Sequence, residues 1–307
     1  MLIESFSGDT NEVIRLRTEI NKALNQRRSV KVKLWQPGIM YQDKDQWKTV
    51  IDFMNEFKGK PVHFFSNLVP LKQVDVDFTY TNDMFLSNHK LYLEDKKCVA
   101  LLEKVNSSDL RPEKTWDLLL GRQTDVKDEL YEMILSHDVF KTTFLTYFKD
   151  NTDHGHWGND VLKPKFNSAE TIDGNMNAFD NPVRHSDLID PSIYSQTSYS
   201  AMIETVIHND FAMFSEKEAK PIMAKRPFVI FGSRHQLKAF RQLGFKTFSP
   251  VIDESYDDIH DRKKRFMMVL DAMNKLSKKN RTNVLKELQD VLNHNRNHFL
   301  EHSWTKV

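Results

Sequence analysis

The sequence is poor in cysteine and has no long apolar run. Cys98 is the single cysteine among 307 residues, so no disulfide can form within the chain, which is typical of a reducing compartment. No stretch approaches the roughly 18 apolar residues of a membrane span. The N-terminal segment also lacks the basic and then apolar layout of a signal peptide. We therefore expect a soluble, cytoplasmic protein with no membrane partner.

Common catalytic signatures are missing as well. The sequence has no G-x-G-x-x-G, no Walker lysine motif, no G-x-S-x-G elbow and no H-E-x-x-H. Their absence argues against the common dehydrogenase, NTPase, hydrolase and zinc-protease templates. The charge is also nearly balanced, at +1. Any contact with nucleic acid must therefore be local.

The first part of the chain alternates between strand and helix patterns. A polar helix is expected near the N-terminus, followed by period-two runs at 30–35 and 74–81 and a strand-like run at 62–68. Between the runs at 30–35 and 62–68, four apolar residues recur at helical spacing: Trp47, Ile51, Met54 and Phe57. These patterns predict a small α/β domain over residues 1–112.

A second series of the same kind begins at Trp116 and predicts another parallel sheet, in a domain over residues 113–307. Its expected elements are a strand (115–122), a helix (125–137), a strand (141–148), a long polar loop (149–191), a strand (198–205), and then helix, strand, helix and strand within 211–248. From Asp253 onward the pattern is helical. One apolar face there is formed by Phe266, Val269, Leu270 and Met273.

Polar residues at the ends of the predicted strands are candidate ligand contacts. Gly121 and Arg122 stand where a strand meets a helix, so backbone N–H groups and a guanidinium would face one phosphate. Glu204 ends an apolar strand, and a carboxylate there can accept hydrogen bonds from both hydroxyls of a ribose. The Gly232-Ser233 turn is a third place for a phosphate. The structural alternatives are a tight turn at Gly121, a surface cation at Arg122 and a solvent-facing Glu204.

Ser215, Glu216 and Lys217 open a predicted helix. Ser215 is a good N-cap and Glu216 suits the positive end of the helix dipole, so capping alone explains both. Lys217 opposes the dipole unless an anion lies beside it, which points to a bound phosphate. Lys220, one turn further on, could join that phosphate or lie in solvent.

The polar loop offers groups for acid–base chemistry. His154, His156 or Asp153 could act as general base toward an acceptor hydroxyl, because both residue types can be suitably protonated near neutral pH. A divalent metal on the His-x-His pair and an ordinary loop are the alternatives. Asp75 and Asp77 share the exposed face of a predicted strand without needing a metal. We predict no required metal.

A basic segment lies near the N-terminus and is opposed within its own span only by Glu19. It fits either a solvated helix face or a surface that contacts the backbone of double-stranded DNA. The residues proposed for that contact are Arg15, Arg17, Arg27, Arg28 and Lys31.

The run from Glu204 to Phe248, continued by residues 253–266, resembles a group of glycosyltransferases encoded by T-even-like and related phages. It is also distantly similar to the donor half of fucosyltransferases, whose Ser/Thr-Glu-Lys helix start contacts the nucleotide diphosphate. The resemblance implies a GT-B fold, in which two Rossmann-like domains face a cleft and C-terminal helices pack back toward the first domain. It places Glu204 and residues 215–217 near the nucleotide and Arg122 at the diphosphate.

The activity that the resemblance implies is transfer of arabinose or glucose from a UDP-sugar to 5-hydroxymethylcytosine in phage DNA, in the host cytoplasm. Helix-start N–H groups and fixed cations would stabilise the departing diphosphate without a metal. The target base would have to leave the duplex, and Trp157 is a candidate wedge. The alternatives are a glycosyltransferase that acts on a carbohydrate or protein hydroxyl, and a noncatalytic nucleotide- or DNA-binding module.

Overall fold

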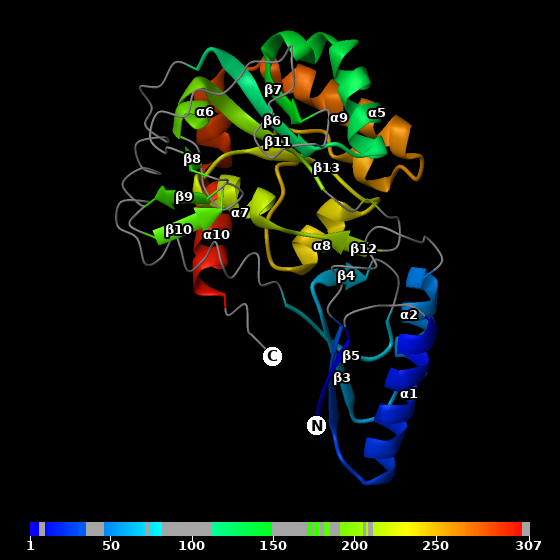
Figure 1. Ribbon diagram of the computed structural model, residues 1–307. Coiled ribbons are helices and arrows are strands. Elements are labelled where there is room, and N and C mark those ends of the chain that lie inside the picture. The colour runs from blue at the N-terminus through cyan, green and yellow to red at the C-terminus, as the bar shows by residue number, and fades with distance from the viewer. Residues whose placement is uncertain are drawn as a thin grey trace.

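Two four-stranded parallel sheets form the frame of the protein (Figure 1). The computed structural model describes residues 1–5, 10–34, 46–70, 74–81, 112–148, 171–172, 175–178, 181–184, 191–204, 207 and 211–302. Along the chain, helices stand between successive strands of both sheets, except between β3 (Val62–Ser66) and β5 (Asp77–Tyr80), where the strand β4 (Leu68–Pro70) lies instead. The predicted α/β class is therefore confirmed.

The first sheet has the strand order β1-β2-β3-β5, and helices α1 and α2 lie against one of its faces (Figure 1). Its elements are β1 (Leu2–Ser5), α1 (Thr10–Asn25), β2 (Val30–Leu34), α2 (Gln46–Asn55), β3 (Val62–Ser66) and β5 (Asp77–Tyr80). Alternate residues of β2 face the core, so Val30, Val32 and Leu34 are buried together with apolar residues of both helices. The sequence patterns do not predict β1, because a strand of 4 residues is too short to show a period.

The second sheet has the strand order β13-β11-β6-β7. Its strands are β6 (Lys114–Arg122), β7 (Thr143–Phe148), β11 (Thr197–Ile203) and β13 (Phe228–Phe231). Every residue of β11 is buried, including the polar Thr197, Ser198 and Ser200, so both faces of this strand are covered.

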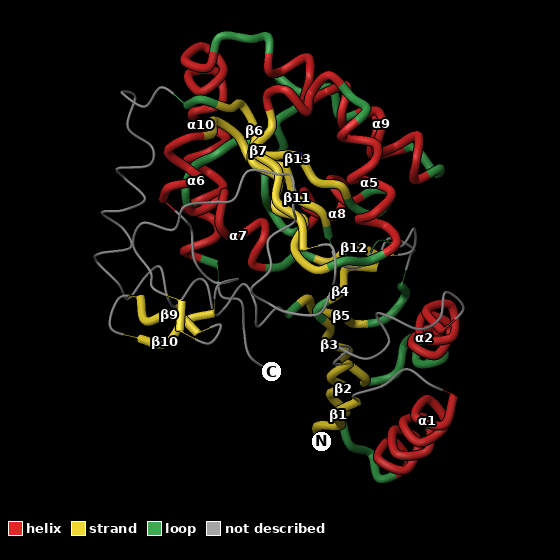
Figure 2. The backbone as a smooth tube through the Cα atoms, turned by 45° about the horizontal axis from the view of Figure 1, so that its top comes forward, coloured by secondary structure: helices red, strands yellow, loops and turns green. Residues whose placement is uncertain are grey.

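Helices lie on both sides of the second sheet. Helices α5 (Asp125–Leu135) and α9 (Arg262–Ser277) are on one side, and α6 (Pro191–Gln196), α7 (Glu216–Met223) and α10 (Arg281–Glu301) are on the other (Figures 1 and 2). Three shorter helical elements complete the connections: η2 (Asp138–Thr142), α8 (Gln236–Gln242) and η4 (Ser255–Asp258).

The order of the strands creates a topological switch point between β6 and β11. From β6 the chain passes through α5 to β7, whereas from β11 it passes through α7 to β13 on the opposite side of the sheet. The two connections therefore leave neighbouring strands in opposite directions. In open α/β sheets, ligands bind outside the carboxyl ends of the strands at such a point.

The C-terminal helices belong to the second core. Phe266, Val269, Leu270 and Met273 are all buried there, as the helical pattern predicts. The other buried apolar residues of α9 and α10 lie in the same core. Within the described residues, the apolar faces of these helices thus pack on the second sheet, and the expected packing toward the first domain is not seen.

Two expectations for the second half are wrong in detail. The run 245–248 is not a strand; Phe245 stacks on Phe240 at 4.5 Å between ring centroids, so its apolar character serves core packing in a loop. Within the predicted loop 149–191, a small antiparallel sheet contains β8 (Thr171–Ile172), β9 (Asn175–Ala178) and β10 (Asn181–Arg184).

A two-stranded ribbon joins the two halves. Strand β12 (Phe211–Met213) follows the second sheet's β11 in the chain, yet it pairs antiparallel with β4 (Leu68–Pro70), which follows β3 of the first sheet. Phe211 and Met213 accordingly lie in the first core. Figure 1 shows the ribbon between the two sheets.

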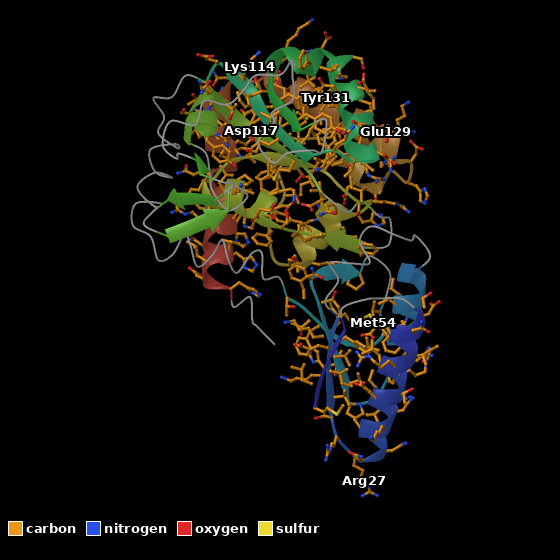
Figure 3. All side chains as sticks on the ribbon, viewed as in Figure 1. Arg27, Met54, Lys114, Asp117, Glu129 and Tyr131 are labelled. Atoms are coloured by element: carbon orange, nitrogen blue, oxygen red, sulfur yellow. The ribbon has the colours of Figure 1, made fainter. Side chains whose placement is uncertain are left out.

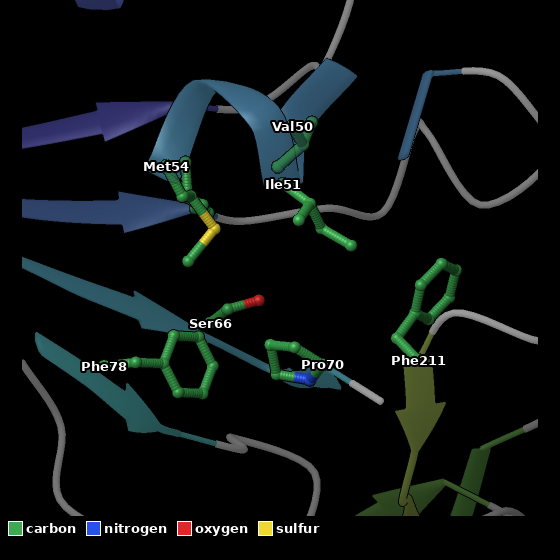
Figure 4. Close-up of a pocket in the computed structure, with 8 residues that line it drawn as sticks. Val50, Ile51, Met54, Ser66, Pro70, Phe78 and Phe211 are labelled. Carbon is green, nitrogen blue, oxygen red and sulfur yellow. The ribbon is translucent and has the colours of Figure 1, made fainter. Parts of the chain in front are cut away.

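A small cavity marks this junction (Figure 4). Phe211 closes it on one side, opposite Ile51 and Met54 of α2, and Ser66 is the one polar residue of its lining. Its volume of about 20 Å³ holds about one water molecule, so it is a packing gap and too small for a sugar or a base.

We predict that Phe211→Ala loosens the first half more than the second. Truncation of a buried phenylalanine lowers the free energy of unfolding by about 3 kcal/mol. Phe211 packs in the first core although its strand, β12, is not part of the first sheet. Denaturant unfolding should show this loss, and hydrogen exchange should accelerate first in β2 and β3. Leu135→Ala, at an exposed position of α5, is the matched control. Equal acceleration in β6 and β11 would contradict the role of Phe211 at the junction.

Candidate functional site

The candidate site lies at the carboxyl ends of β6 and β11, at the switch point. Leu118 of β6 pairs with Ala201 of β11, and Gly121 and Glu204 each lie three residues beyond that pair. Helix α5 starts directly after β6. The start of α7 meets the end of β11, because Ser215 Oγ is 3.4 Å from Glu204 Oε1. Two helix starts therefore converge on one edge of the sheet.

At the end of β6, a glycine turn brings a buried lysine to the sheet edge. Gly121 has a φ of +67°, in the left-handed region, and the β6–β7 register shifts between Leu119 and Arg122. A Cβ on Gly121 would lie 3.8 Å from Lys127 Nζ. Lys127 is only 6% exposed although it stands in the first turn of α5. The side chain of Arg122 lies outside the described part of the structure.

Lys127 is a candidate that the sequence analysis misses. A cation in the first turn of a helix opposes the dipole, and the same criterion singles out Lys217. The sequence therefore does contain an indication of Lys127, namely a lysine in the first turn of a helix. It is hidden because Asp125 and Asp128 in the same turn make the start of α5 look like an ordinary acidic one.

The start of α7 is capped from within the chain. Ser215 Oγ accepts a hydrogen bond from the Lys217 backbone N–H at 3.4 Å, and Glu218 Oε2 accepts one from the Ser215 N–H at 2.8 Å. This is a capping box, for which S-x-x-E is the sequence signature. The sequence analysis recognises Ser215 as the cap and misses its partner Glu218.

The anions beside Lys217 are carboxylates of the protein. Its Nζ donates to Ser215 Oγ at 3.1 Å and to Glu216 Oε1 at 3.2 Å. Burial alone would lower the pKa of this ammonium, but Glu204, Glu216 and Glu218 outweigh burial and raise it. The conflict of Lys217 with the helix dipole is thus resolved inside the chain, and it no longer requires a phosphate.

Glu204 and Glu218 are fully enclosed. Glu204 is 1% exposed and Glu218 is 0% exposed, so Glu204 neither points into solvent nor presents an open carboxylate to a ribose in this structure. Glu216 lies nearer the surface with Lys217. Burial raises the pKa of Glu216, but Lys217 and the half-buried Lys220 reverse this and lower it.

The start of α8 is filled by side chains. Asp257 accepts hydrogen bonds from the backbone N–H groups of Leu237 at 2.9 Å and Lys238 at 3.0 Å. Gln236 Oε1 accepts from the Ser233 N–H, and a Cβ on Gly232 would lie 2.9 Å from Gln236 Cγ. In this structure the Gln236 side chain therefore occupies the Gly232-Ser233 turn, where the sequence analysis expects a phosphate.

Two of the five basic residues proposed to contact DNA, Arg15 and Arg17, form ion pairs, and they lie away from this site. Arg15 bonds Glu12 at 2.6 Å and Glu19 at 2.7 Å. Arg17 bonds Glu56 at 2.6 Å. Glu12 and Glu56 lie outside the basic segment, so a count within the segment misses them.

The remaining proposed DNA contacts lie in the turn before β2 (Arg27 and Arg28) and in β2 itself (Lys31). Arg27 and Arg28 are exposed, and Lys31 Nζ lies 5.6 Å from the Phe65 ring centroid. Figure 3 shows Arg27 at the tip of the first half, at the end remote from the second sheet. This tip is at the amino end of β2, whereas the ribbon β4–β12 lies beyond the carboxyl end of β3.

The proposed general bases His154, His156 and Asp153 lie outside the described residues. Within the described ranges, no three His, Cys, Asp or Glu side chains are grouped so that they could hold a metal ion. Asp75 instead bonds Lys58 at 2.6 Å. None of the helices described here is long and apolar enough to cross a membrane.

Comparison of the chain with families of related proteins, with curated proteins and with solved structures finds no match.

We predict that Lys217→Met lowers the stability of the protein by about 2 kcal/mol at neutral pH, because it removes a cation from among buried carboxylates. The pKa of Glu216 is depressed in the folded state, so the stability that Lys217 supplies is present above the ordinary glutamate pKa and lost as the pH falls. Denaturant unfolding should therefore show a smaller loss in acid. The exposed Lys238→Met is the control and should change stability by less than about 0.5 kcal/mol. Equal losses for both variants would contradict the internal role of Lys217.

Proposed function

We propose that the protein is a nucleotide-sugar-dependent glycosyltransferase that binds a UDP-sugar at the carboxyl edge of the second sheet. The observation that supports this most directly is the switch point, where the left-handed Gly121 and the buried Lys127 stand beside the start of α5. Helix starts with a nearby cation favour phosphate groups.

In this proposal the departing diphosphate meets positive charge from both sides of the switch point. Lys127 and the start of α5, where Thr124 caps the Lys127 N–H, face it from the β6 side, and Lys217 faces it from the start of α7. Fixed positive charge of this kind stabilises a leaving diphosphate without a metal. Arg122 joins them on the strength of the sequence resemblance. Glu204 lies behind Lys217 and positions it.

The acceptor would enter from the side of the first half. The ribbon β4–β12 brings the first sheet next to the residues that lead into α7, which supports a GT-B arrangement of two Rossmann-like domains. One of His154, His156 and Asp153 would deprotonate the attacking hydroxyl in this proposal.

As acceptor we propose 5-hydroxymethylcytosine in double-stranded DNA, with exposed Arg27 and Arg28 as nonspecific contacts to the backbone. A carbohydrate or protein hydroxyl is the second candidate. It is favoured by the ion pairs that occupy Arg15 and Arg17, because paired guanidinium groups attract a polyanion less.

A mass measurement distinguishes these acceptors. The protein is incubated with hydroxymethylcytosine-containing duplex DNA and a panel of UDP- and GDP-sugars, and the nucleosides are then analysed by mass spectrometry. We expect a mass gain with one UDP-sugar. Release of UDP without a mass gain in the DNA would support a glycosyltransferase and contradict the DNA acceptor. No nucleotide release with any donor would contradict the glycosyltransferase and leave a noncatalytic binding module.

Gly121→Ala should weaken UDP binding beyond its effect on stability. A left-handed backbone costs a non-glycine residue about 1 kcal/mol, and the new methyl group would contact Lys127 Nζ. Gly59→Ala is a matched control, because Gly59 has a similar φ of +71° with nothing within 4 Å of the added Cβ. Both variants should lose similar stability in denaturant. If calorimetric titration with UDP shows the same affinity for both, the proposed phosphate position is wrong.

A further inference from the structure

The start of α7 holds more carboxyl oxygens than hydrogen-bond donors. Glu204 and Glu218 each use one oxygen on Ser215, through its hydroxyl and its backbone N–H. The other oxygen of each, Glu204 Oε2 and Glu218 Oε1, is buried with no donor among the described residues. An enclosed oxygen without a donor costs about 1 to 3 kcal/mol, so two in one place require an explanation.

Both carboxyl groups bond the same residue, Ser215, and a hydrogen bond with Glu204 is among the causes that raise the pKa of Glu218. Two ionised carboxylates are acceptors only, so a hydrogen bond between them requires a proton on one of them. One proton would give both remaining oxygens a partner at once. It would also remove one of two negative charges that share a site closed to water.

We propose that Glu204 and Glu218 share one proton at neutral pH and that this acid pair positions Lys217 and sets the charge that an anionic ligand meets. The second part rests on the proposed function, since it takes the ligand to be a nucleoside diphosphate. The charged groups that face the pair are Lys217 and Glu216, with Lys220 beyond Glu216. Glu204 and Glu218 are positioning residues here, because neither is open to a ligand.

The direction of the pH dependence follows from this arrangement. Burial first, and then the charge of Glu204, raise the pKa of Glu218 well above its usual range. The stability that the shared proton supplies is therefore complete in acid and lost as the pH rises through the raised pKa. A bound diphosphate adds negative charge beside Lys217 and favours the protonated pair. Diphosphate binding should accordingly weaken by about tenfold per pH unit once the pair loses its proton.

The pair itself is tested by infrared spectroscopy of the ligand-free protein at neutral pH. We expect the carbonyl band of a protonated carboxylic acid in the wild type, and loss of that same band in both Glu218→Gln and Glu204→Gln. A glutamine at either position can donate the missing hydrogen bond, and glutamine also serves in a capping box, so both variants should fold. Glu287→Gln, at an exposed position of α10, should leave the band unchanged. Absence of the band in the wild type, or its survival in both variants, would overturn the proposal.

The coupling to a ligand is tested by titrating UDP across the neutral and alkaline range. Affinity should fall with pH in the wild type and stay flat in Glu218→Gln, which mimics the protonated pair. The same pH dependence in both proteins would overturn the coupling. If the infrared band is present but UDP binds at no pH, the acid pair stands and the proposed nucleotide site fails, so the two failures are distinguishable.

Discussion

A single buried guanidinium holds the amino end of the second sheet together. Arg226 donates to Asp117 at 2.9 Å, to the Tyr194 and Thr197 carbonyl oxygens at 3.0 Å, and to the hydroxyl groups of Thr197 and Ser200. The guanidinium carbon lies 4.1 Å from the centroid of the Tyr194 ring. Asp117 comes from β6 and Arg226 from the residues just before β13, so one side chain fixes three neighbouring strands. Burial of such a charge is tolerated only because its donors are so completely used.

The carboxyl end of the same sheet is built in the opposite way. At the amino end, Asp117 Oδ2 meets Arg226, Thr197 and Ser200, so charge and hydrogen bonds balance. At the carboxyl end, three carboxyl groups surround Lys217, and one oxygen of each is buried with no donor in the described part of the chain. Stability alone does not select such an imbalance, because an apolar helix start would cost less. Perturbed carboxyl groups of this kind are enriched at functional sites, which supports the proposal of a site at the carboxyl end of β11 rather than at its amino end.

The sequence predicts those features whose cause is local. Period and capping rules locate most strands of both sheets, the α7 start at Ser215 and the buried face of α9, because each depends on neighbours along the chain. They fail at residues 245–248, where aromatic residues fill a loop by long-range packing. They also fail for Lys217, whose counter-ions include Glu204, a residue thirteen positions away on another element. Burial of Lys127 and pairing of Arg17 with Glu56 likewise depend on tertiary contacts that no window of sequence contains.

The junction between the halves and the candidate site are parts of one continuous segment. Phe211 and Met213 are packed in the first core, and only Phe214 separates them from the cap residue Ser215. The backbone of residues 213–214 is also held by hydrogen bonds from both halves of the protein. Gln236 donates to the Met213 carbonyl oxygen at 2.7 Å, and Tyr80 of the first sheet donates to that of Phe214 at 3.4 Å. A displacement of the first half relative to the second would therefore be transmitted directly to Ser215. Since Ser215 bonds both Glu204 and Glu218, the proposed acid pair lies at the end of this segment.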